Sequence, residues 1–376
     1  HGRPRMSKAA ELAALIGSQS ALSHRNFIIN GAMQVAQRST GTVTVSNGSN
    51  EGYSTLDRFM INMNNAVSGA VDMSQSSNAP EGFAHSLKLK CQTTNTTYTN
   101  TKLVEIRHKI EGQNLQLLGF GTSSAKPITV SWYMKTVNYT GPISLSLQTQ
   151  DGTAQYYAKS ITPTTSWARY TCTIPGSTSA TIDNDSGSGM TVDFVVAGGS
   201  SGTNAASSDS TGFSTTRVDY RNDIGNLLAN TSNEFYITGV QLEVGEQATP
   251  FEHRSFADEL HRCKRYFQKS YLYEDAVGTN TSTGMYFCQR FDSNDRYFLL
   301  TKNFPVEMRA TPTKEIRDRN NSSTDRINVY NGGGTRIDIA SISGGDSKTI
   351  ARFLDNDSGS GSDSVQEFHW TADAEL

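Results

Sequence analysis

The chain has 376 residues, so at roughly 100 to 200 residues per domain we expect two or three domains, each with its own core. Hydrophobic residues make up 35% of the chain and charged residues 18%, an apolar share below that of an ordinary enzyme domain and typical of β-rich proteins whose strands bury alternate residues. The formal net charge is −3 and the sequence contains no long basic run, which argues against a nucleic-acid partner.

Two further classes are disfavoured by the sequence. No stretch approaches the roughly 20 apolar residues that cross a bilayer, and the N-terminus lacks a signal-peptide pattern, so we expect no membrane insertion. The cysteines are far apart and form no CxxC pair, which favours free thiols over a zinc site or a disulfide framework. They are Cys91, Cys172, Cys263 and Cys288.

Residues 1–25 are predicted to form a short attachment segment. The first five residues, before Met6, are typical of a vector or processing remnant. A short helix is expected over Lys8 to Ile16, and a helix of about ten residues needs a partner surface to be stable. We therefore predict that its apolar stripe joins neighbouring subunits or a larger assembly. The stripe consists of Leu12, Leu15 and Ile16.

Residues 26–252 are predicted to form a jelly-roll β-sandwich. Short strand-like runs alternate with clusters of Gly, Asn, Ser and Thr, and the clearest run is ITVSWYMKT, residues 128–136. Its alternation places Trp132 on the apolar face, so we expect this ring in the core. Residues 197–212 show no apolar period and are predicted to be a long exposed loop. Further strands are expected at 144–148, 167–174, 190–196 and 234–244.

A linking helix is predicted over residues 253–270. Ser255 is the expected N-cap, with Asp258 three residues later, and apolar residues follow at helical spacing. The last segment, residues 271–376, returns to strand-like runs, and its NGGG sequence at Asn331 is a hairpin-turn signal. We therefore expect a mostly β protein that ends in an antiparallel β domain.

Aromatic side chains with a polar edge are candidates for glycan binding, because they can stack on the apolar face of a sugar ring. Burial in the sheets is the alternative, and for the distal aromatic residues packing within a trimer is another. The candidates are Tyr133, Tyr139, Tyr156, Tyr271, Tyr273 and Tyr330.

The sequence DNDSGSG occurs at 183–189 and again at 355–361. Aspartates at positions i and i+2 before a glycine turn can gather oxygen ligands around Ca²⁺. No glutamate completes either loop, and such runs are also common exposed turns. We expect no other cofactor. The candidate calcium ligands are Asp183, Asp185, Asp355 and Asp357.

No convincing catalytic motif is present. The single GxSxG match, residues 198–202, opens a Gly/Ser-rich stretch and lacks the helical pattern that a nucleophile elbow needs. We therefore expect no enzyme activity.

Several segments resemble a known family. The sequences NFIINGAMQVAQRST (26–40) and YSTLDRFMI (53–61) resemble the start of many bacteriophage tail-fibre and virion-associated proteins, especially those of marine and cyanobacterial phages. Residues 126–136 and 166–174 resemble the carbohydrate-binding-module-like jelly roll of these proteins. The most specific match runs from Phe235 to Ser270, and a further match is the ending TADAEL at 371–376.

The resemblance implies a non-catalytic virion surface protein, most simply a homotrimeric tail fibre. Its partners would be other copies of itself, other virion proteins through the N-terminal segment, and a host cell-surface polysaccharide. Two alternatives stay open: a capsid-attached decoration or horn-like fibre, and a tail-spike polysaccharide depolymerase. The sequence contains no fixed period of the kind that β-helix depolymerases show.

Overall fold

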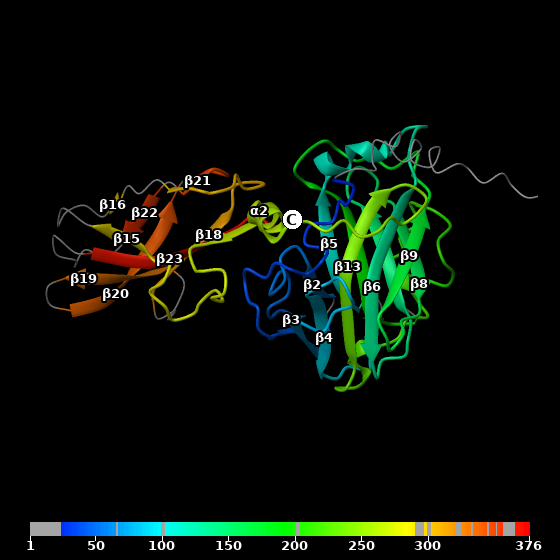
Figure 1. Ribbon diagram of the computed structural model, residues 1–376, viewed down its shortest axis with the longest axis horizontal. Helices are drawn as coiled ribbons and strands as arrows, with labels where there is room; N and C mark the ends of the chain where they lie inside the picture. The colour runs from blue at the N-terminus through cyan, green and yellow to red at the C-terminus, as the bar shows by residue number, and fades with distance from the viewer. Residues whose placement is uncertain are drawn as a thin grey trace, which may run out of the picture.

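A computed structural model describes residues 24–376 apart from 65–66, 99–101, 201–203, 290–296, 299–301, 320–324, 332–333, 344–345, 351 and 356–364. The predicted N-terminal helix, with Leu12, Leu15 and Ile16, therefore lies outside the described residues, as does Asp357. The described part is mostly β, as predicted, and forms an elongated molecule with a sandwich at one end and a smaller β domain at the other (Figure 1). No helix within these residues is long and apolar enough to span a membrane.

The first sheet of the sandwich has six antiparallel strands. In spatial order they are β1 (Val43–Ser46), β3 (Ala70–Ser76), β4 (Ser86–Thr93), β13 (Glu234–Val244), β6 (Ile128–Val137) and β9 (Ala168–Ile174). Alternation along β6 places Trp132 in the core, where it is fully buried and packs edge-on against Phe194 of the other sheet, as the sequence predicted.

The second sheet has five antiparallel strands and covers the inner face of the first. In spatial order they are β2 (Met60–Asn64), β5 (Leu103–Glu111), β10 (Ser188–Gly198), β7 (Ile143–Thr149) and β8 (Tyr156–Ile161). The chain passes from one sheet to the other after most strands, which is the connectivity of a jelly roll. One continuous core, with residues from Ile28 to Leu242, joins the two sheets.

The segment predicted as an exposed loop over 197–212 is in part ordered against the second sheet. Strand β10 extends to Gly198, and a small parallel pair follows, formed by β11 (Ala205–Ala206) and β12 (Tyr220–Arg221). The Ser210 amide donates to the Ala158 carbonyl of β8 at 2.9 Å, and Ser214 forms a bridge with Tyr156. Two short 3-10 turns, η1 (Gly112–Leu118) and η2 (Leu227–Ala229), complete the sandwich.

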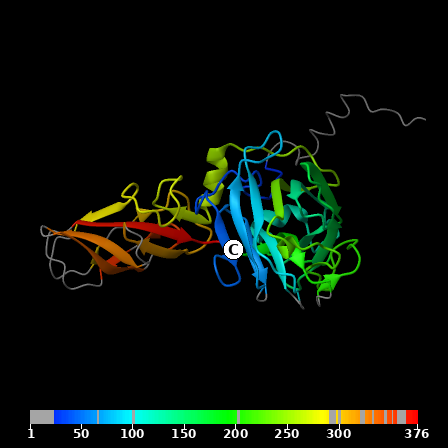
Figure 2. The same ribbon diagram turned by 90° about the horizontal axis from the view of Figure 1, so that it is seen from below.

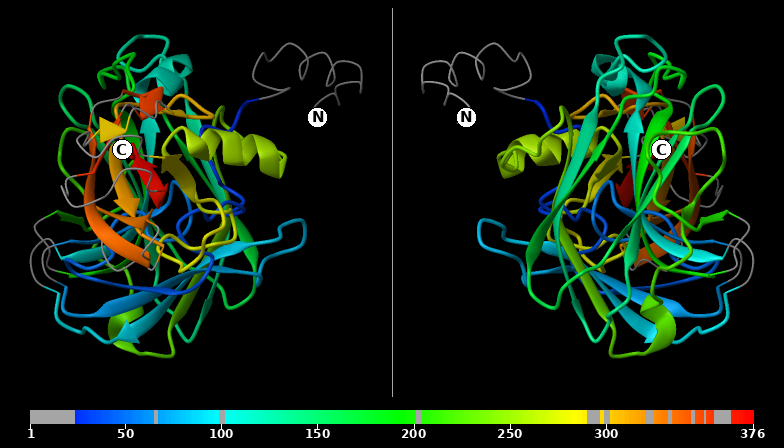
Figure 3. Two further views of the ribbon diagram at one scale, coloured as in Figure 1. Left: turned by 90° about the vertical axis from the view of Figure 1, so that its left-hand side faces the viewer. Right: turned by 90° about the vertical axis from the view of Figure 1, so that its right-hand side faces the viewer.

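The linking helix α2 spans Phe256–Lys264 and is shorter than predicted. Its start is as expected, because the Ser255 hydroxyl accepts a hydrogen bond from the Asp258 amide at 3.1 Å. The helix ends earlier than expected, because Phe267–Lys269 form strand β14 and pair with the last strand of the chain. Seen along the long axis, α2 lies at one side of the molecule beside the first described residues (Figure 3).

The distal domain is built around its last strand, β23 (Val365–Asp373), which pairs with β14 and with three others. The other strands are β15 (Tyr286–Gln289), β16 (Tyr297–Phe298), β17 (Lys302–Asn303), β18 (Thr313–Arg317), β19 (Arg326–Asn331), β20 (Gly334–Ser343), β21 (Thr349–Ile350) and β22 (Arg352–Asp355). Strands β19 and β20 form the hairpin predicted at Asn331. A second core, separate from that of the sandwich, includes Phe304, Ile316 and Trp370.

The two ends of the molecule meet at a joint formed by α2, β14 and the C-terminal residues. Figures 1 and 2 show β23 returning from the distal domain so that the chain ends against the sandwich. There the Ala374 amide donates to the Tyr266 carbonyl at 2.8 Å, and the Lys109 ammonium donates to the Leu376 carbonyl at 2.6 Å.

Candidate functional site

A polar pocket of about 120 Å³ lies on the outer face of the five-stranded sheet, away from the core. Strand alternation explains its composition, because residues 104 and 106 of β5 point into the core while residues 105 and 107 point outward. The principal polar groups are Asn62 from β2, Glu105 and Arg107 from β5, Gln148 from β7, Tyr156 from β8, Asp193 from β10, and Arg217 and Asp219 from the covering segment.

One guanidinium organises the floor of this pocket. Arg107 forms ion pairs with Glu105 at 2.7 Å and with Asp193 at 2.8 Å. The Asn62 amide donates to the Glu105 carboxylate at 2.8 Å, and the Thr191 hydroxyl donates to Asp193 at 2.9 Å. Both carboxylates are almost fully buried. The floor is therefore a prearranged set of charged donors and acceptors held by several strands.

Glu105 is the most perturbed acid of the pocket. Burial, and secondly the nearby Asp193 carboxylate, raise the pKa of Glu105 to about 7, although Arg107 and the Asn62 hydrogen bond oppose the shift. Perturbed acids of this kind are concentrated at functional sites, although structural ion-pair networks produce them as well. Near neutral pH this carboxyl can therefore donate or accept a hydrogen bond.

The mouth of the pocket is covered in part by the segment that precedes β12. Arg217 in this segment forms a bidentate pair with Asp219, with Nε at 3.0 Å from a carboxylate oxygen. Tyr156, a predicted glycan-binding residue, lines the pocket and is half-buried. Its ring and the polar floor together offer both an aromatic and a hydrogen-bonding surface to a ligand.

The charged residues of the floor were not predicted from the sequence. The β5 sequence LVEIRHKIE does contain a signal, because the charged residues Glu105, Arg107 and Lys109 alternate with Val104, Ile106 and the buried His108. Their meeting with Asp193 depends on the antiparallel pairing of β5 with β10, in which Arg107 lies opposite Asp193. That register joins segments 86 residues apart and cannot be read from either segment by itself.

The other predicted tyrosines are dispersed over the molecule. Tyr133 is half-buried on the outer face of the six-stranded sheet, and Tyr273 lies at the joint, where its hydroxyl accepts from the Ala36 amide at 2.9 Å. The candidate role of Tyr139 and Tyr271 must be corrected, because these rings are only 3% and 4% exposed and cannot stack on a sugar. Tyr330 is part of β19, opposite Thr335, and its side chain lies outside the described atoms.

Of the predicted calcium ligands, the structure describes Asp183 and Asp185 with their side chains and Asp355 by its backbone. Asp183 and Asp185 lie in the turn before β10, where the Asp185 carboxylate accepts from the Gly187 amide at 2.8 Å. Asp355 is the last residue of β22. Across the part of the chain that the structure describes, no group of three His, Cys, Asp or Glu residues is arranged to hold a metal ion. The calcium sites therefore stay a prediction from sequence.

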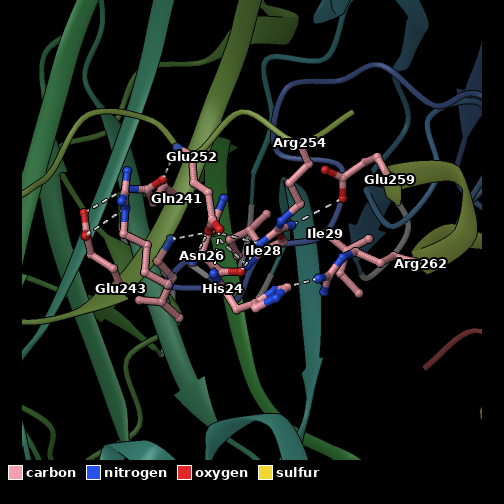
Figure 4. A network of polar contacts seen from close by, with 12 residues as sticks. His24, Asn26, Ile28, Ile29, Gln241, Glu243, Glu252, Arg254, Glu259 and Arg262 are labelled. Carbon is pink, nitrogen blue, oxygen red and sulfur yellow. Dashed lines mark hydrogen bonds and ion pairs between the residues drawn. The ribbon is translucent and has the colours of Figure 1, made fainter. Parts of the chain in front are cut away.

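A second polar network connects the start of the described chain to the last sandwich strand and to α2 (Figure 4). The Asn26 side chain accepts from the Leu242 amide at 3.1 Å, and the Glu252 carboxylate accepts from the Asn26 amide at 2.8 Å. Arg254 donates to the Ile28 carbonyl and pairs with Glu259 of α2. These contacts are internal and satisfy buried backbone groups, so we interpret the network as structural.

The joint contains a buried cluster of charges next to this network. Arg58 forms an ion pair with Glu375, and Arg38 pairs with Glu375 at 3.3 Å and with Asp373 at 2.7 Å. Asp57 accepts from the Gln37 amide at 2.8 Å. Four of the six segments that carry the sequence resemblance, 26–40, 53–61, 235–270 and 371–376, thus contribute residues to the joint or to the network beside it. The other two, 126–136 and 166–174, belong to β6 and β9 and their flanking residues in the sandwich.

No protein-family model matches the chain, and no curated protein matches it. Solved structures to which the chain is similar include the enzymatically active domain of tailspike protein 4 of bacteriophage CBA120, which is 12% identical with a TM-score of 0.30. That match covers 58% of this chain but only 21% of the tailspike chain.

Two further similar structures are matched over nearly their whole length. A family 11 carbohydrate-binding module of Clostridium thermocellum is 14% identical with a TM-score of 0.28, over 56% of this chain and 99% of the module. A putative sugar-binding protein from Bacteroides thetaiotaomicron is 10% identical with a TM-score of 0.30, over 59% of this chain and all of that protein.

Proposed function

We propose that this protein is a virion attachment protein, most simply a tail fibre, that binds a host-surface glycan in the pocket on the five-stranded sheet without cleaving it. The observation that carries the proposal is the buried triad of Glu105, Arg107 and Asp193, fixed by neighbouring strands at the floor of a pocket. The resemblance of segments 26–40 and 235–270 to phage fibre proteins supports the virion part of the proposal.

The chemistry of the pocket suits a sugar. Sugar hydroxyls both donate and accept, and the floor offers carboxylate acceptors beside guanidinium and amide donors. The volume of about 120 Å³ is well below the roughly 300 to 1,000 Å³ of sites for drug-sized ligands, so the pocket can take no more than one sugar unit of a chain. Its two arginines are already paired with carboxylates, which favours a neutral sugar.

The variant Asp193→Asn tests the pocket, because it removes one charge with little change in shape. Binding of the purified protein to isolated host polysaccharide should weaken at least about tenfold, equivalent to roughly 1.4 kcal/mol. The control is Glu246→Gln, which changes an exposed carboxylate in the loop after β13, outside the pocket, and should bind as the unmodified protein does. Equal binding by both variants, with both still folded by circular dichroism, would place the glycan site elsewhere.

Hydrolysis of the glycan is a second candidate function, favoured by one observation. Glu105 and Asp193 lie on paired strands, and Glu105 has the raised pKa that a general acid needs. Against it, Arg107 bridges both carboxylates and leaves neither free for a scissile bond. The chain length of the polysaccharide after incubation decides between the two functions. Shortening that is abolished in Glu105→Gln would establish a depolymerase.

Trimeric association and a place on the virion are part of the same proposal. Three copies of a weak glycan site on one rigid particle gain avidity without new contacts. Light scattering should give three times the 40.9 kDa chain mass, whereas a monomer mass would refute the trimer. Immunogold labelling of intact particles separates the tail from the capsid alternative.

A further inference from the structure

A row of alternating lysine and aromatic residues crosses the outer face of the six-stranded sheet, on the opposite side of the sandwich from the pocket. Tyr236 of β13 lies opposite Lys88 of β4 on one side and opposite Lys135 of β6 on the other. Trp167 continues the row, because it directly precedes Ala168, the first residue of β9. With neighbouring strands about 4.8 Å apart, the backbones of the two lysines are roughly 10 Å apart.

Aromatic rings hold the two ammonium groups of this row. The Lys135 ammonium is 5.0 Å from the centre of the Tyr236 ring and 5.6 Å from that of Trp167, and the Lys88 ammonium is 5.3 Å from Tyr236. The Trp167 indole is itself fixed, since its Nε1 donates to the Asn78 side chain at 3.2 Å. Cation–π attraction therefore keeps both positive charges in defined places.

The charges of the row are only partly neutralised. Glu234 pairs with Lys88 at 2.8 Å and accepts from the Tyr236 hydroxyl at 2.6 Å. No carboxylate within the described residues forms an ion pair with Lys135. This lysine is half-buried, and its ammonium lies against the Tyr236 and Trp167 rings without a carboxylate partner. An anion at this point would be bound favourably.

We propose that this lysine–aromatic row is a second saccharide-binding site, specific for an acidic sugar. The carboxylate or sulfate of the sugar would pair with Lys135, and the apolar face of its ring would pack on Trp167. The aromatic surface continues along the same sheet face, where Phe83 packs on Tyr133 at 5.3 Å and on Phe251 at 5.1 Å between ring centres. These half-buried rings extend the aromatic surface beside the charged subsite, where further sugars of a chain would lie.

Binding of the full chain to two acidic polymers, polygalacturonate and dextran sulfate, tests this site, with dextran as the neutral polymer. We expect Lys135→Gln to weaken binding of an acidic polymer about tenfold, and Trp167→Ala to weaken it at least as much. The matched control is Lys126→Gln, which removes an exposed lysine at the end of the sandwich and should leave binding unchanged. Trp167→Phe keeps a ring and should retain most of the affinity if the ring packs on sugar.

The outcomes separate this site from the pocket. Asp193→Asn should leave binding of acidic polymers intact, so a failure of the pocket proposal does not affect this test. Preference for polygalacturonate or for dextran sulfate identifies the anionic group. The proposal is overturned if neither polymer binds, or if Lys126→Gln weakens binding as much as Lys135→Gln, because the latter result would mean general attraction between charges.

Discussion

At the scale of single residues, the pKa of Glu105 makes stability depend on pH. Its value of about 7 in the folded protein lies above the ordinary 4.5, so the folded state retains a proton that the unfolded chain releases. The contribution of Glu105 to the free energy of unfolding is fully present below pH 4.5 and is lost as the pH rises through 7. The loss amounts to at most about 3 kcal/mol. Urea unfolding should therefore show that the unmodified protein loses stability relative to Glu105→Gln between pH 5 and pH 8.

The control for this experiment is Glu81→Gln, which changes an exposed glutamate. The free energy of unfolding of this variant should change with pH in the same way as that of the unmodified protein over the whole range. If the free energy of unfolding of Glu105→Gln also follows that of the unmodified protein with pH, the Glu105 carboxyl is ionised throughout this range and the pocket floor is permanently charged.

The same scale shows why the site was predicted only in part. Tyr156 was named because an aromatic ring with a polar edge is visible in the sequence, and it does line the pocket. Tyr139 has the same chemistry but is buried, and its hydroxyl is already used, because it donates to the Pro142 carbonyl at 2.8 Å in the turn after β6. The difference between the two rings depends on tertiary packing, which residue type and spacing do not contain.

At the scale of elements, periodicity predicted strands well and their irregularities poorly. The strand predicted at 234–244 has the same bounds in the structure, yet it contains a bulge between Thr238 and Gln241. The linking helix was predicted too long because the apolar spacing continues to Phe267, whereas pairing of β14 with β23 takes these residues into a sheet. Long-range pairing overrides local propensity in both places.

The bulge gives a prediction for Gly239, whose φ is +63°. A Cβ atom here would lie 2.7 Å from the Phe83 ring and 2.9 Å from the Tyr133 ring. We expect Gly239→Ala to destabilise the sandwich by about 2 to 4 kcal/mol, through backbone strain and overpacking together. Gly82→Ala is the matched control, because Gly82 has a φ of +88° but open space around it. In thermal unfolding, Gly239→Ala should lose more stability than Gly82→Ala. Equal losses of stability would mean that backbone strain, and not overpacking, is the main cause.

At the scale of the whole molecule, the order of sandwich, helix and second β domain was expected, but the joint between them was not. From the sequence, TADAEL (371–376) showed a resemblance to a family but no structural role. In the structure, this segment brings Glu375 into contact with Arg38 and Arg58 of the sandwich. Arg58 and Glu375 are 317 residues apart in the sequence, so this contact could not be predicted from either segment alone.

The joint also gives a prediction. Arg58→Met removes one cation from the buried cluster and leaves Glu375 with Arg38 only, so we expect a loss of about 3 kcal/mol. Lys348→Met breaks an exposed pair with Glu307 at 3.6 Å and should cost less than about 1 kcal/mol. Hydrogen exchange locates the effect, because the Ala374 amide, bonded across the joint to Tyr266, should exchange faster in Arg58→Met only. Unchanged protection of this amide would mean that the joint is held by its backbone hydrogen bonds, and that the charges fix its geometry without adding to its stability.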